Sequence, residues 1–363
     1  MSFNPFGFLK GAISHSYLGV DIGTTSIKIA EVHRGKQLPR MTNYAFLEAS
    51  NYLGRGNSAL QTSSLKLFEK ETAELLGAAI SQMKTHISDA LVSLPIFSAF
   101  LTVLRFPMMS PEELSKAVIF HAQQYVPLPL SDVVLDWLKV GEFEDEQGNK
   151  QQHVLLISVP QEHIQKYQRI FKTAGLNLRV LEIESLSVAR ALVGNDPTPT
   201  VIIDIGSRST NISFIDKGKL RLNSQSDYAG ASLTEAIATS LNINAQRAEE
   251  LKRQKGIIGT GADYELSTIM LPFLDVIINE VKKARANYET QFLGTPKIER
   301  AIITGGTANL KGILKYMQRE LEMPVVKAAP FTRFEYDPSL EELVPELNPV
   351  MSVALGLGLR EYS

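Results

Sequence analysis

The sequence of 363 residues contains no cysteine and no excess of either charge. Without cysteine the chain can form no disulfide, thiolate metal site or cysteine nucleophile. Its 37 basic and 39 acidic side chains leave a formal net charge of −2. This balance argues against sequence-independent binding to nucleic acid, because such binding needs clustered Lys and Arg. A hydrophobic share of 44% and a charged share of 21% are ordinary for globular proteins, and the length predicts two domains.

Long apolar runs are also missing. No stretch reaches the roughly 18 consecutive apolar residues that are typical of a membrane-spanning helix. The nearest one, 90–104, is interrupted by Pro95 and diluted by Ser and Thr, so it is predicted to form two buried strands joined at the proline. Residues 1–16 lack the basic start and long apolar core of a signal peptide, and we interpret them as an N-terminal tail. These features favour a cytoplasmic protein.

The sequence does contain an internal repeat. One stretch reads LGVDIGTTSIKI around Asp21, and another reads VIIDIGSRSTNI around Asp204. The two aspartates lie 183 residues apart (204 − 21), and the same offset separates Gly35 from Gly218 in the Gly-Lys turns that follow (218 − 35). Each hairpin is followed by a third extended segment and a helix. The chain is therefore predicted to contain two related β-β-β-α units, and hence two lobes of similar design.

The two turns have the composition of anion sites. Glycine lets the backbone pass close to a ligand, and consecutive N–H groups in a turn of small hydroxyl residues form a concave site for phosphate. An aspartate at such a turn repels phosphate unless a cation lies between them. Asp21 and Asp204 therefore predict a Mg²⁺ ion that is held partly through water, and Lys28 can supply charge to a terminal phosphate. The sequence contains neither G-x-x-x-x-G-K-[ST] nor G-x-G-x-x-G.

A third element follows the second hairpin. Residues 298–303 predict a strand, which leads through the run TGGTAN into an amphipathic helix that ends near Leu321. A helix N-terminus favours negative charge, so this junction is suited to the α-phosphate and sugar of a nucleotide. Gly305, Gly306 and Asn309 are its predicted nucleotide-binding residues.

In this order the three motifs resemble the phosphate-1, phosphate-2 and adenosine loops of the actin-like ATPase superfamily, to which actin, Hsp70, sugar kinases and FtsA belong. From about Tyr17 to its end the chain is similar to the PilM family of type IV pilus assembly. The most specific segment, Leu94 to Trp137, includes RFPMMSPEEL and QYVPLP, and SPEE within it has the form of a helix start. The resemblance implies an α/β actin-like ATPase (ribonuclease H-like) fold, with two duplicated lobes and an inserted subdomain of FtsA/PilM type in the first.

The family plan also implies the division of the chain. Ala354, Gly356 and Gly358 permit the close approach that a helix crossing between lobes needs. The expected units, in chain order, are the tail (1–16), domain I (17–196, with a core of 17–96 and 177–196 and a small inserted subdomain near 97–176), domain II as the nucleotide-binding lobe (198–343), and a C-terminal crossing helix that returns to domain I (344–363).

The resemblance assigns roles to further residues. Glu184 follows a predicted strand and opens a helix, where related ATPases keep a carboxylate or amide near the attacking water; helix capping is the alternative. Glu249 and Lys252 match the adenine-side helix of the superfamily, with a solvated charged face as the alternative. The turns contribute the nucleotide-binding residues Gly23, Thr24, Thr25, Lys28, Gly206, Ser207, Arg208, Ser209, Thr210 and Asn211.

Catalysis is expected to be weak. Asn211 stands where FtsA and Hsp70 have a second aspartate, and an amide can neither act as a base nor contribute metal-binding charge. Ser207-Arg208 replaces the pair of glycines that is typical of the family at this turn. We therefore expect binding of ATP and Mg²⁺ with at most slow hydrolysis, for which Glu184 is the catalytic candidate.

The function that the resemblance implies is that of a cytoplasmic platform, peripheral at the inner membrane. It would bind the N-terminal cytoplasmic tail of PilN, with PilO and the pilus motor ATPases as indirect partners, and would contact the membrane only through partners. The inserted subdomain is predicted to form a cleft with the core that clamps a short extended peptide. The alternatives are an FtsA-like filament-forming cell-division protein and a slow actin-like or Hsp70-like ATPase.

Overall fold

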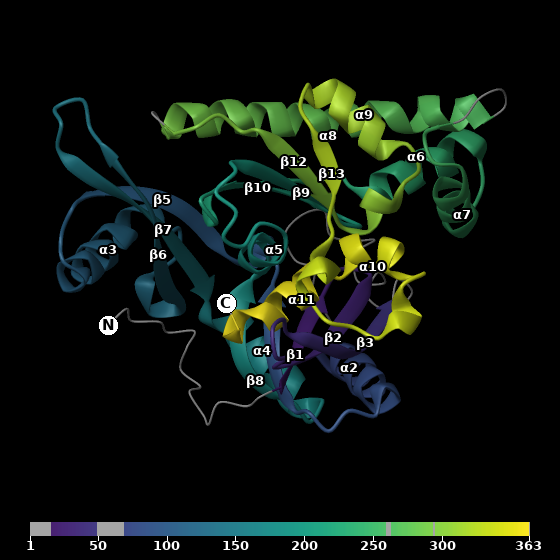
Figure 1. The fold of residues 1–363 in the computed structure, drawn as a ribbon, viewed down its shortest axis with the longest axis horizontal. Coiled ribbons are helices and arrows are strands. Elements are labelled where there is room, and N and C mark those ends of the chain that lie inside the picture. The colour runs from purple at the N-terminus through teal and green to yellow at the C-terminus, as the bar shows by residue number, and fades with distance from the viewer. Residues whose placement is uncertain (1–15, 49–68, 259–262, 293–294, 363) are drawn as a thin grey trace.

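The computed structural model describes residues 16–48, 69–258, 263–292 and 295–362. Its first sheet, in the lower part of Figure 1, has the strand order β3-β2-β1-β4-β8. In this sheet β2 runs antiparallel to both neighbours, whereas β1, β4 and β8 run parallel. The strands are β1 (Ser16–Ile22), β2 (Ser26–His33), β3 (Arg40–Glu48), β4 (Asp89–Leu94) and β8 (Asn177–Ile183).

The second sheet repeats this arrangement. Its order is β11-β10-β9-β12-β13, and it has the same pattern of parallel and antiparallel pairs. In the two sheets Asp21 pairs with Lys28 and Asp204 pairs with Asn211, at equivalent positions of the repeat. The structure thereby confirms the two related units. The strands are β9 (Thr200–Ile205), β10 (Thr210–Asp216), β11 (Lys219–Ser226), β12 (Arg300–Thr304) and β13 (Val325–Lys327).

Helices cover both faces of the first sheet, which explains why its central strands are continuous apolar runs. Helices α2 (Glu69–Met83) and α4 (Gln161–Thr173) pack together, with α2 against β3 and α4 against β8. Helix α5 (Glu184–Leu192) packs against α11 (Ser352–Gly358), which crosses β1, β2 and β4. We call this sheet with its helices the first lobe.

The second lobe is built on the second sheet. Its helix α8 (Asp263–Gln291) is the long green helix at the top of Figure 1, and it packs against β10, β11 and α6. Met270, Leu274 and Ile277 recur at a helical spacing and are buried in the core of this lobe. The remaining helices are α6 (Gly230–Leu241), α7 (Ala245–Lys255) and α9 (Ile313–Leu321).

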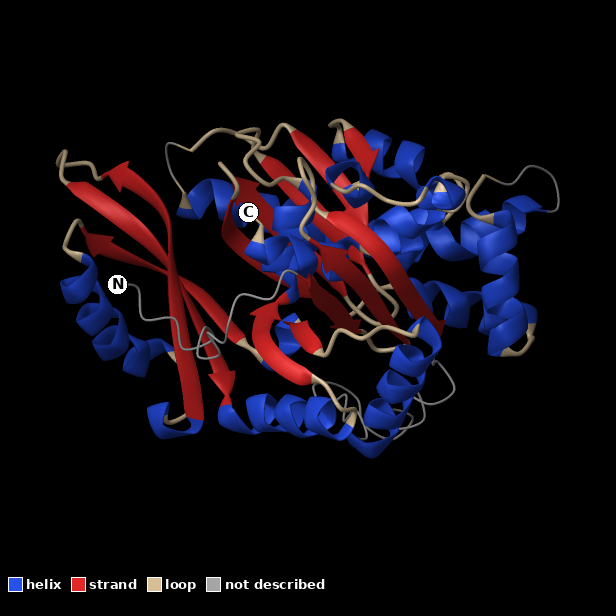
Figure 2. Cartoon of the chain, turned by 60° about the horizontal axis from the view of Figure 1, so that its bottom comes forward, coloured by secondary structure: helices blue, strands red, loops and turns tan. Residues whose placement is uncertain are grey.

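A third sheet stands at the left of Figures 1 and 2. It consists of β5 (Phe100–Pro107), β7 (Lys150–Pro160) and β6 (Val133–Glu144), all antiparallel and in that order. Helix α3 (Pro111–Tyr125) lies on this sheet and completes a core of its own. The predicted helix start is confirmed, because Ser110 and Glu113 form a capping box with Pro111 in the first turn.

The apolar run around Pro95 forms two strands as predicted, but they belong to different sheets. Strand β4 ends at Leu94 in the first lobe, Ile96–Ser98 form a 3₁₀ turn, and β5 begins the third sheet. The chain leaves the first lobe at this point and returns through α4 and β8.

The end of the chain crosses between the lobes in two short helices, drawn in yellow in Figure 1. Helix α10 (Val344–Val350) packs against β12 of the second lobe, and α11 packs on the first lobe. Gly356 allows this crossing, because a Cβ at this position would lie 2.0 Å from the Ser187 carbonyl oxygen. None of the helices that the structure describes is long and apolar enough to cross a membrane.

Candidate functional site

The residues Asp21 and Lys28 meet next to the turn of the β1–β2 hairpin. Lys28 Nζ lies 2.9 Å from Asp21 Oδ2, and both side chains are largely buried. The hydroxyl of Ser93, near the end of β4, donates a hydrogen bond of 2.8 Å to Asp21 Oδ1. The antiparallel neighbour β2 and the parallel neighbour β4 therefore fix the aspartate of β1 from two sides.

Glu184 comes from the junction of β8 and α5 and faces the second lobe. Its Oε1 accepts a hydrogen bond of 2.7 Å from Asn211 Nδ2 and one of 3.1 Å from the backbone N–H of Ile96. Helix α5 is preceded by Ile183 as its N-cap, without a side-chain cap. Glu184 is therefore not the N-cap of α5, and its side chain contacts Asn211 and Ile96 from other elements.

Asp21, Asp204 and Glu184 form a carboxylate cluster around the single ammonium of Lys28. Burial raises the pKa of the Glu184 carboxyl to about 8, and the charges of Asp204 and Asp21 act in the same direction. Burial also raises the pKa of Asp204 to about 6, with Lys28 opposing and Asp21 adding to the effect. Burial alone would lower the pKa of Lys28, but the three carboxylates outweigh it and raise the pKa. The cluster has an excess of negative charge, so it favours a further cation.

The donor set fits a magnesium ion that is bound mainly through water and ligand oxygens. Asp21 and Asp204 supply carboxylates, which are the hard oxygen donors that Mg²⁺ prefers. Asn211 Oδ1 is buried and has no hydrogen-bond partner among the described residues. The part of the chain that the structure describes contains no group of three or more His, Asp or Glu residues that could hold a metal ion by itself.

The two predicted phosphate turns have the same geometry. In the first, Gly23 N–H donates to Ser26 O at 2.9 Å, and in the second, Gly206 N–H donates to Ser209 O at 3.0 Å. The polar residues within the turns are only half-buried, so a ligand can reach them; they are Thr24, Thr25, Ser207, Arg208 and Ser209. Thr210, at the start of β10, is buried and donates to Tyr228 O.

The third motif approaches the carboxylate cluster through its first glycine. Gly305 has a φ of +83°, and a Cβ here would lie 2.5 Å from Asp204 Oδ1. Gly306 is exposed. Residues Gly306–Asn309 form a 3₁₀ turn, and the predicted helix follows as α9, which starts at Ile313 and ends at Leu321. Asn309 Nδ2 donates to Glu346 O at 2.9 Å, so its amide holds α10 rather than pointing to the cluster.

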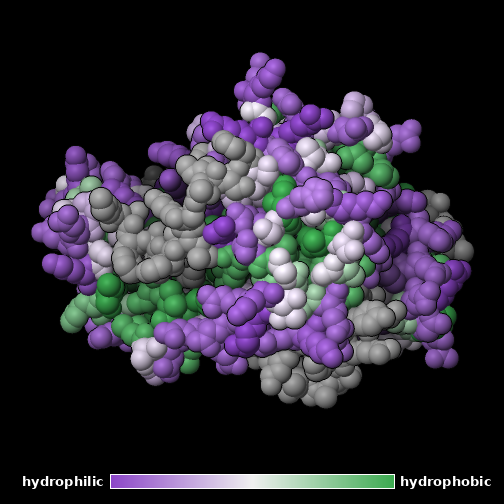
Figure 3. Space-filling model, turned by 90° about the horizontal axis from the view of Figure 1, so that it is seen from below, coloured by the Kyte–Doolittle hydropathy of each residue, from purple (hydrophilic) through white to green (hydrophobic). Residues whose placement is uncertain are grey.

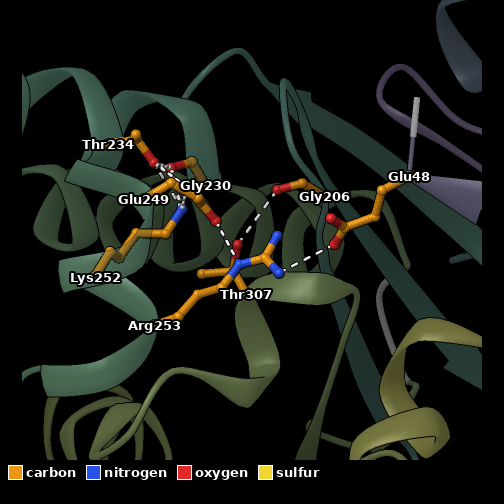
Figure 4. A network of polar contacts seen from close by, with 8 residues as sticks. All are labelled: Glu48, Gly206, Gly230, Thr234, Glu249, Lys252, Arg253 and Thr307. Atoms are coloured by element: carbon orange, nitrogen blue, oxygen red, sulfur yellow. Dashed lines mark hydrogen bonds and ion pairs between the residues drawn. The ribbon is translucent and has the colours of Figure 1, made fainter. Parts of the chain in front are cut away.

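A second polar network, drawn in Figure 4, joins α7 to the start of α6. The Lys252 ammonium lies 2.7 Å from Glu249 Oε2 and donates to Gly230 O at 2.9 Å and to Thr234 Oγ1 at 2.8 Å. Burial opposes the ionisation of Glu249, yet Lys252, Thr234 and Arg253 together lower its pKa to about 2. Lys252 is buried, so the alternative of a solvated charged face does not hold for it.

The same network reaches the first lobe. Arg253 Nε donates to Glu249 Oε1 at 2.8 Å, and Arg253 Nη1 lies 3.0 Å from Glu48 Oε1 at the end of β3 (Figure 4). Thr307 Oγ1 donates to Gly206 O at 3.4 Å and so connects the third motif to the second turn. The contacts of Ser93, Thr234, Thr307, Arg253 and Glu48 were not predicted from the sequence. Of these residues, Thr307 alone lies within a motif identified from the sequence, the run TGGTAN.

A cavity lies between the first lobe and the third sheet. Its volume is about 60 Å³. Strands β6 and β8, which both contribute to its wall, are each the last strand of their sheet. We call this feature the edge cavity. It is lined by Leu94, Asp136, Leu138, Ile157, Val159, Leu181, Glu182, Ile183, Leu186 and Arg360.

Apolar side chains also reach the surface on the side of the third sheet. Figure 3, seen from below, shows apolar side chains gathered at the left, where Figure 1 places this sheet. Phe120 on α3 is 65% exposed, and Ile119, Tyr125, Leu128 and Leu138 are also exposed.

Comparisons of sequence and of structure with known proteins identify the family and the fold of the chain. A family model described as type IV pilus assembly protein PilM matches residues 19–362. The cell division protein FtsA of Pseudomonas aeruginosa is 22% identical over 390 aligned residues, which cover 95% of this chain and 90% of that protein.

Among solved structures, a PilM–PilN type IV pilus biogenesis complex matches with a TM-score of 0.80 and 24% identity, over 96% of this chain and 98% of that chain. MreB 5 of Spiroplasma citri bound to AMPPNP matches with a TM-score of 0.56 and 14% identity, over 96% and 97% of the two chains. These structural likenesses establish the actin-like fold.

Proposed function

Because the chain belongs to the family of the type IV pilus assembly protein PilM, we propose that it is an ATP-binding platform that captures the cytoplasmic tail of a PilN-type partner at the inner membrane. The observation that carries the nucleotide part is the pair of equivalent hairpins, which place Asp21 with Lys28 and Asp204 with Asn211 around one carboxylate cluster. An actin-like neighbour of known structure holds AMPPNP, which supports the same ligand class here.

Within this proposal each element of the cluster has its own task. Mg²⁺ would supply the positive charge that offsets the carboxylates. ATP would supply the phosphates that bind at the two turns. Asp21 and Asp204 would hold the metal, Lys28 would face the terminal phosphate, and the turn N–H groups would bind phosphate oxygens. The Lys252 network would contact the sugar and base side of the nucleotide.

Glu184 is proposed to position water, with slow turnover. Burial raises the pKa of its carboxyl to about 8, so at neutral pH it holds a proton and cannot act as a base. A bound cation would lower this pKa and release the proton. Asn211 cannot assist, since an amide is no base, and this supports at most slow hydrolysis.

The edge cavity is the proposed peptide site. It lies between the first lobe and the third sheet with α3. We assign this sheet and α3 to the inserted subdomain expected near 97–176, without α4, which packs on the first lobe. Strands β6 and β8 present unpaired strand edges to it within the described residues, and an extended peptide can pair with such an edge. The PilM–PilN complex among the structural neighbours supports PilN as the source of the peptide. Recruitment through this tail would place the protein at the inner membrane, with PilO and the motor ATPases as indirect partners.

Two measurements test this function. Calorimetry on nucleotide-free protein should detect Mg-ATP binding, and its absence for ATP, ADP and analogues would contradict the nucleotide role. A synthetic N-terminal tail of the PilN homologue from the same organism should bind the protein with or without nucleotide.

A matched pair of variants locates the peptide. Leu138→Arg places a charge in the edge cavity, whereas Leu128→Arg places it at an equally exposed position outside the cavity wall. We expect the first variant alone to lose peptide binding, and both to retain ATP binding. If neither variant, or both, loses the peptide, the edge cavity is the wrong site.

A further inference from the structure

One carboxylate in the wall of the edge cavity has few partners. Asp136 lies on β6, and its Oδ1 accepts a hydrogen bond of 2.8 Å from the backbone N–H of Trp137. It forms no ion pair with the residues that the structure describes. The cation that acts on it is Arg360, whose Nη1 lies 2.6 Å from Glu182 Oε2.

The other acidic group of the cavity is well compensated. Glu182 Oε1 accepts a hydrogen bond from Arg190, and its Oε2 accepts one from Arg360. Glu182 is therefore paired with two guanidinium groups, whereas Asp136 is influenced by the charge of Arg360 without forming an ion pair with it. Burial raises the pKa of Asp136 to about 6, as expected for a carboxylate that lacks a close cation.

The remainder of the wall is apolar and follows the pattern of the strand. Asp136 and Leu138 are two residues apart on β6 and both line the cavity, because alternate side chains of a strand point to the same face. Strand β6 is the last strand of its sheet. A peptide strand added at this edge would place one side chain beside Asp136 and the side chain two positions away beside Leu138.

Taking the edge cavity as the peptide site of the proposed function, we propose that Asp136 selects a tail in which a Lys or Arg is separated by one residue from a large apolar side chain. The basic group pairs with Asp136, and the apolar group packs on Leu138 and the adjoining apolar wall. A charge-assisted hydrogen bond in a partly buried site is stronger than a neutral one, so the pair makes a large contribution to selectivity.

The experiment is a double-mutant cycle on the full chain. The probe is the synthetic N-terminal tail of the PilN homologue from the same organism, labelled for fluorescence anisotropy. Its basic residue is replaced by Gln in a second peptide. On the protein, Asp136→Asn keeps the shape and removes the charge, and Asp132→Asn is the matched control at an exposed turn outside the cavity wall.

We expect Asp136→Asn and the neutralised peptide each to weaken binding at least about tenfold, and their combination to weaken it no further. The control variant should bind like the parent protein. Thermal melting reports on folding: Asp136→Asn should melt at or above the temperature of the parent, because it removes a poorly compensated buried charge.

The possible failures are distinguishable. The pairing is overturned, while the peptide site stands, if Asp136→Asn binds the natural tail with an affinity within about twofold of that of the parent. It is also overturned if replacing the basic residue of the peptide lowers the affinity as much for this variant as for the parent. If the parent protein binds no tail, or Leu138→Arg binds it unchanged, the proposed function fails and this inference fails with it.

Discussion

Asn211 of the second lobe donates a hydrogen bond of 2.7 Å to Glu184 of the first lobe. The bond joins the proposed water-positioning carboxylate to the second phosphate turn, across a separation of 27 residues. The oxygen of the same side-chain amide, Asn211 Oδ1, is buried and has no hydrogen-bond partner within the described part of the chain. A group of this kind is costly unless a ligand or water completes it, so ligand binding and the contact between the lobes are expected to be linked.

The first prediction concerns the Asp21–Lys28 pair. Asp21→Asn should weaken Mg-ATP binding at least about tenfold, because it removes a metal-binding charge and leaves Lys28 without its close anion. Calorimetry on nucleotide-free protein measures this, with Asp132→Asn as the control for a charge removed elsewhere. Equal affinities for the two variants would contradict the assignment of Asp21.

A second prediction uses the pKa of Glu184. In the folded protein burial raises this pKa to about 8, above the value of 4.5 for an ordinary glutamate. Between these two values the folded state binds more protons than the unfolded state, so this group lowers stability as the pH rises. Glu184→Gln should therefore raise the melting temperature of the nucleotide-free protein more at pH 8 than at pH 5, by at least about 2–4 °C. A constant difference between the two pH values would contradict the raised pKa.

Lys252 provides a third test. Lys252→Met should lower the free energy of unfolding by about 2–3 kcal/mol, because it removes a buried cation beside Glu249 and the hydrogen bonds that this cation donates to Gly230 O and Thr234 Oγ1. It should also weaken nucleotide binding. Chemical denaturation measures the loss, and Lys255→Met, at an exposed position of the same helix, should change the stability little. Similar losses in both variants would point to a general effect on α7.

The fourth prediction concerns the Glu48–Arg253 contact between the lobes. Both side chains are more than half exposed, and an exposed pair is worth about 0.2–1 kcal/mol. Glu48→Gln should therefore speed the release of a fluorescent ATP analogue by at most about fivefold at low salt. Stopped-flow release in low and high salt tests this, since salt screens exposed pairs. An effect that persists at high salt would show that the ion pair is not its cause.

Much of the fold and part of the site could be predicted from sequence because they depend on local patterns. The two Asp-Ile-Gly turns, their 183-residue offset and the SPEE helix start each lie within a short segment whose turn and cap chemistry is local. Alternation and apolar runs likewise identify strands. The 3₁₀ turn at Gly306–Asn309, which Gly312 with a φ of +90° separates from α9, was not predicted.

The duplicated hairpins, the residue types at the phosphate turns and the family resemblance all follow from the pattern of amino acids alone. Only the tertiary structure decided that Ser93 holds Asp21, that Lys252 is buried, that Glu48 meets Arg253, and that Asp136 faces a cavity between two sheet edges. These contacts join residues from different elements, some of them in different lobes. Propensity and periodicity act over a few residues, whereas the environment of a charge is set by whichever elements pack around it, and this packing is decided by the fold as a whole.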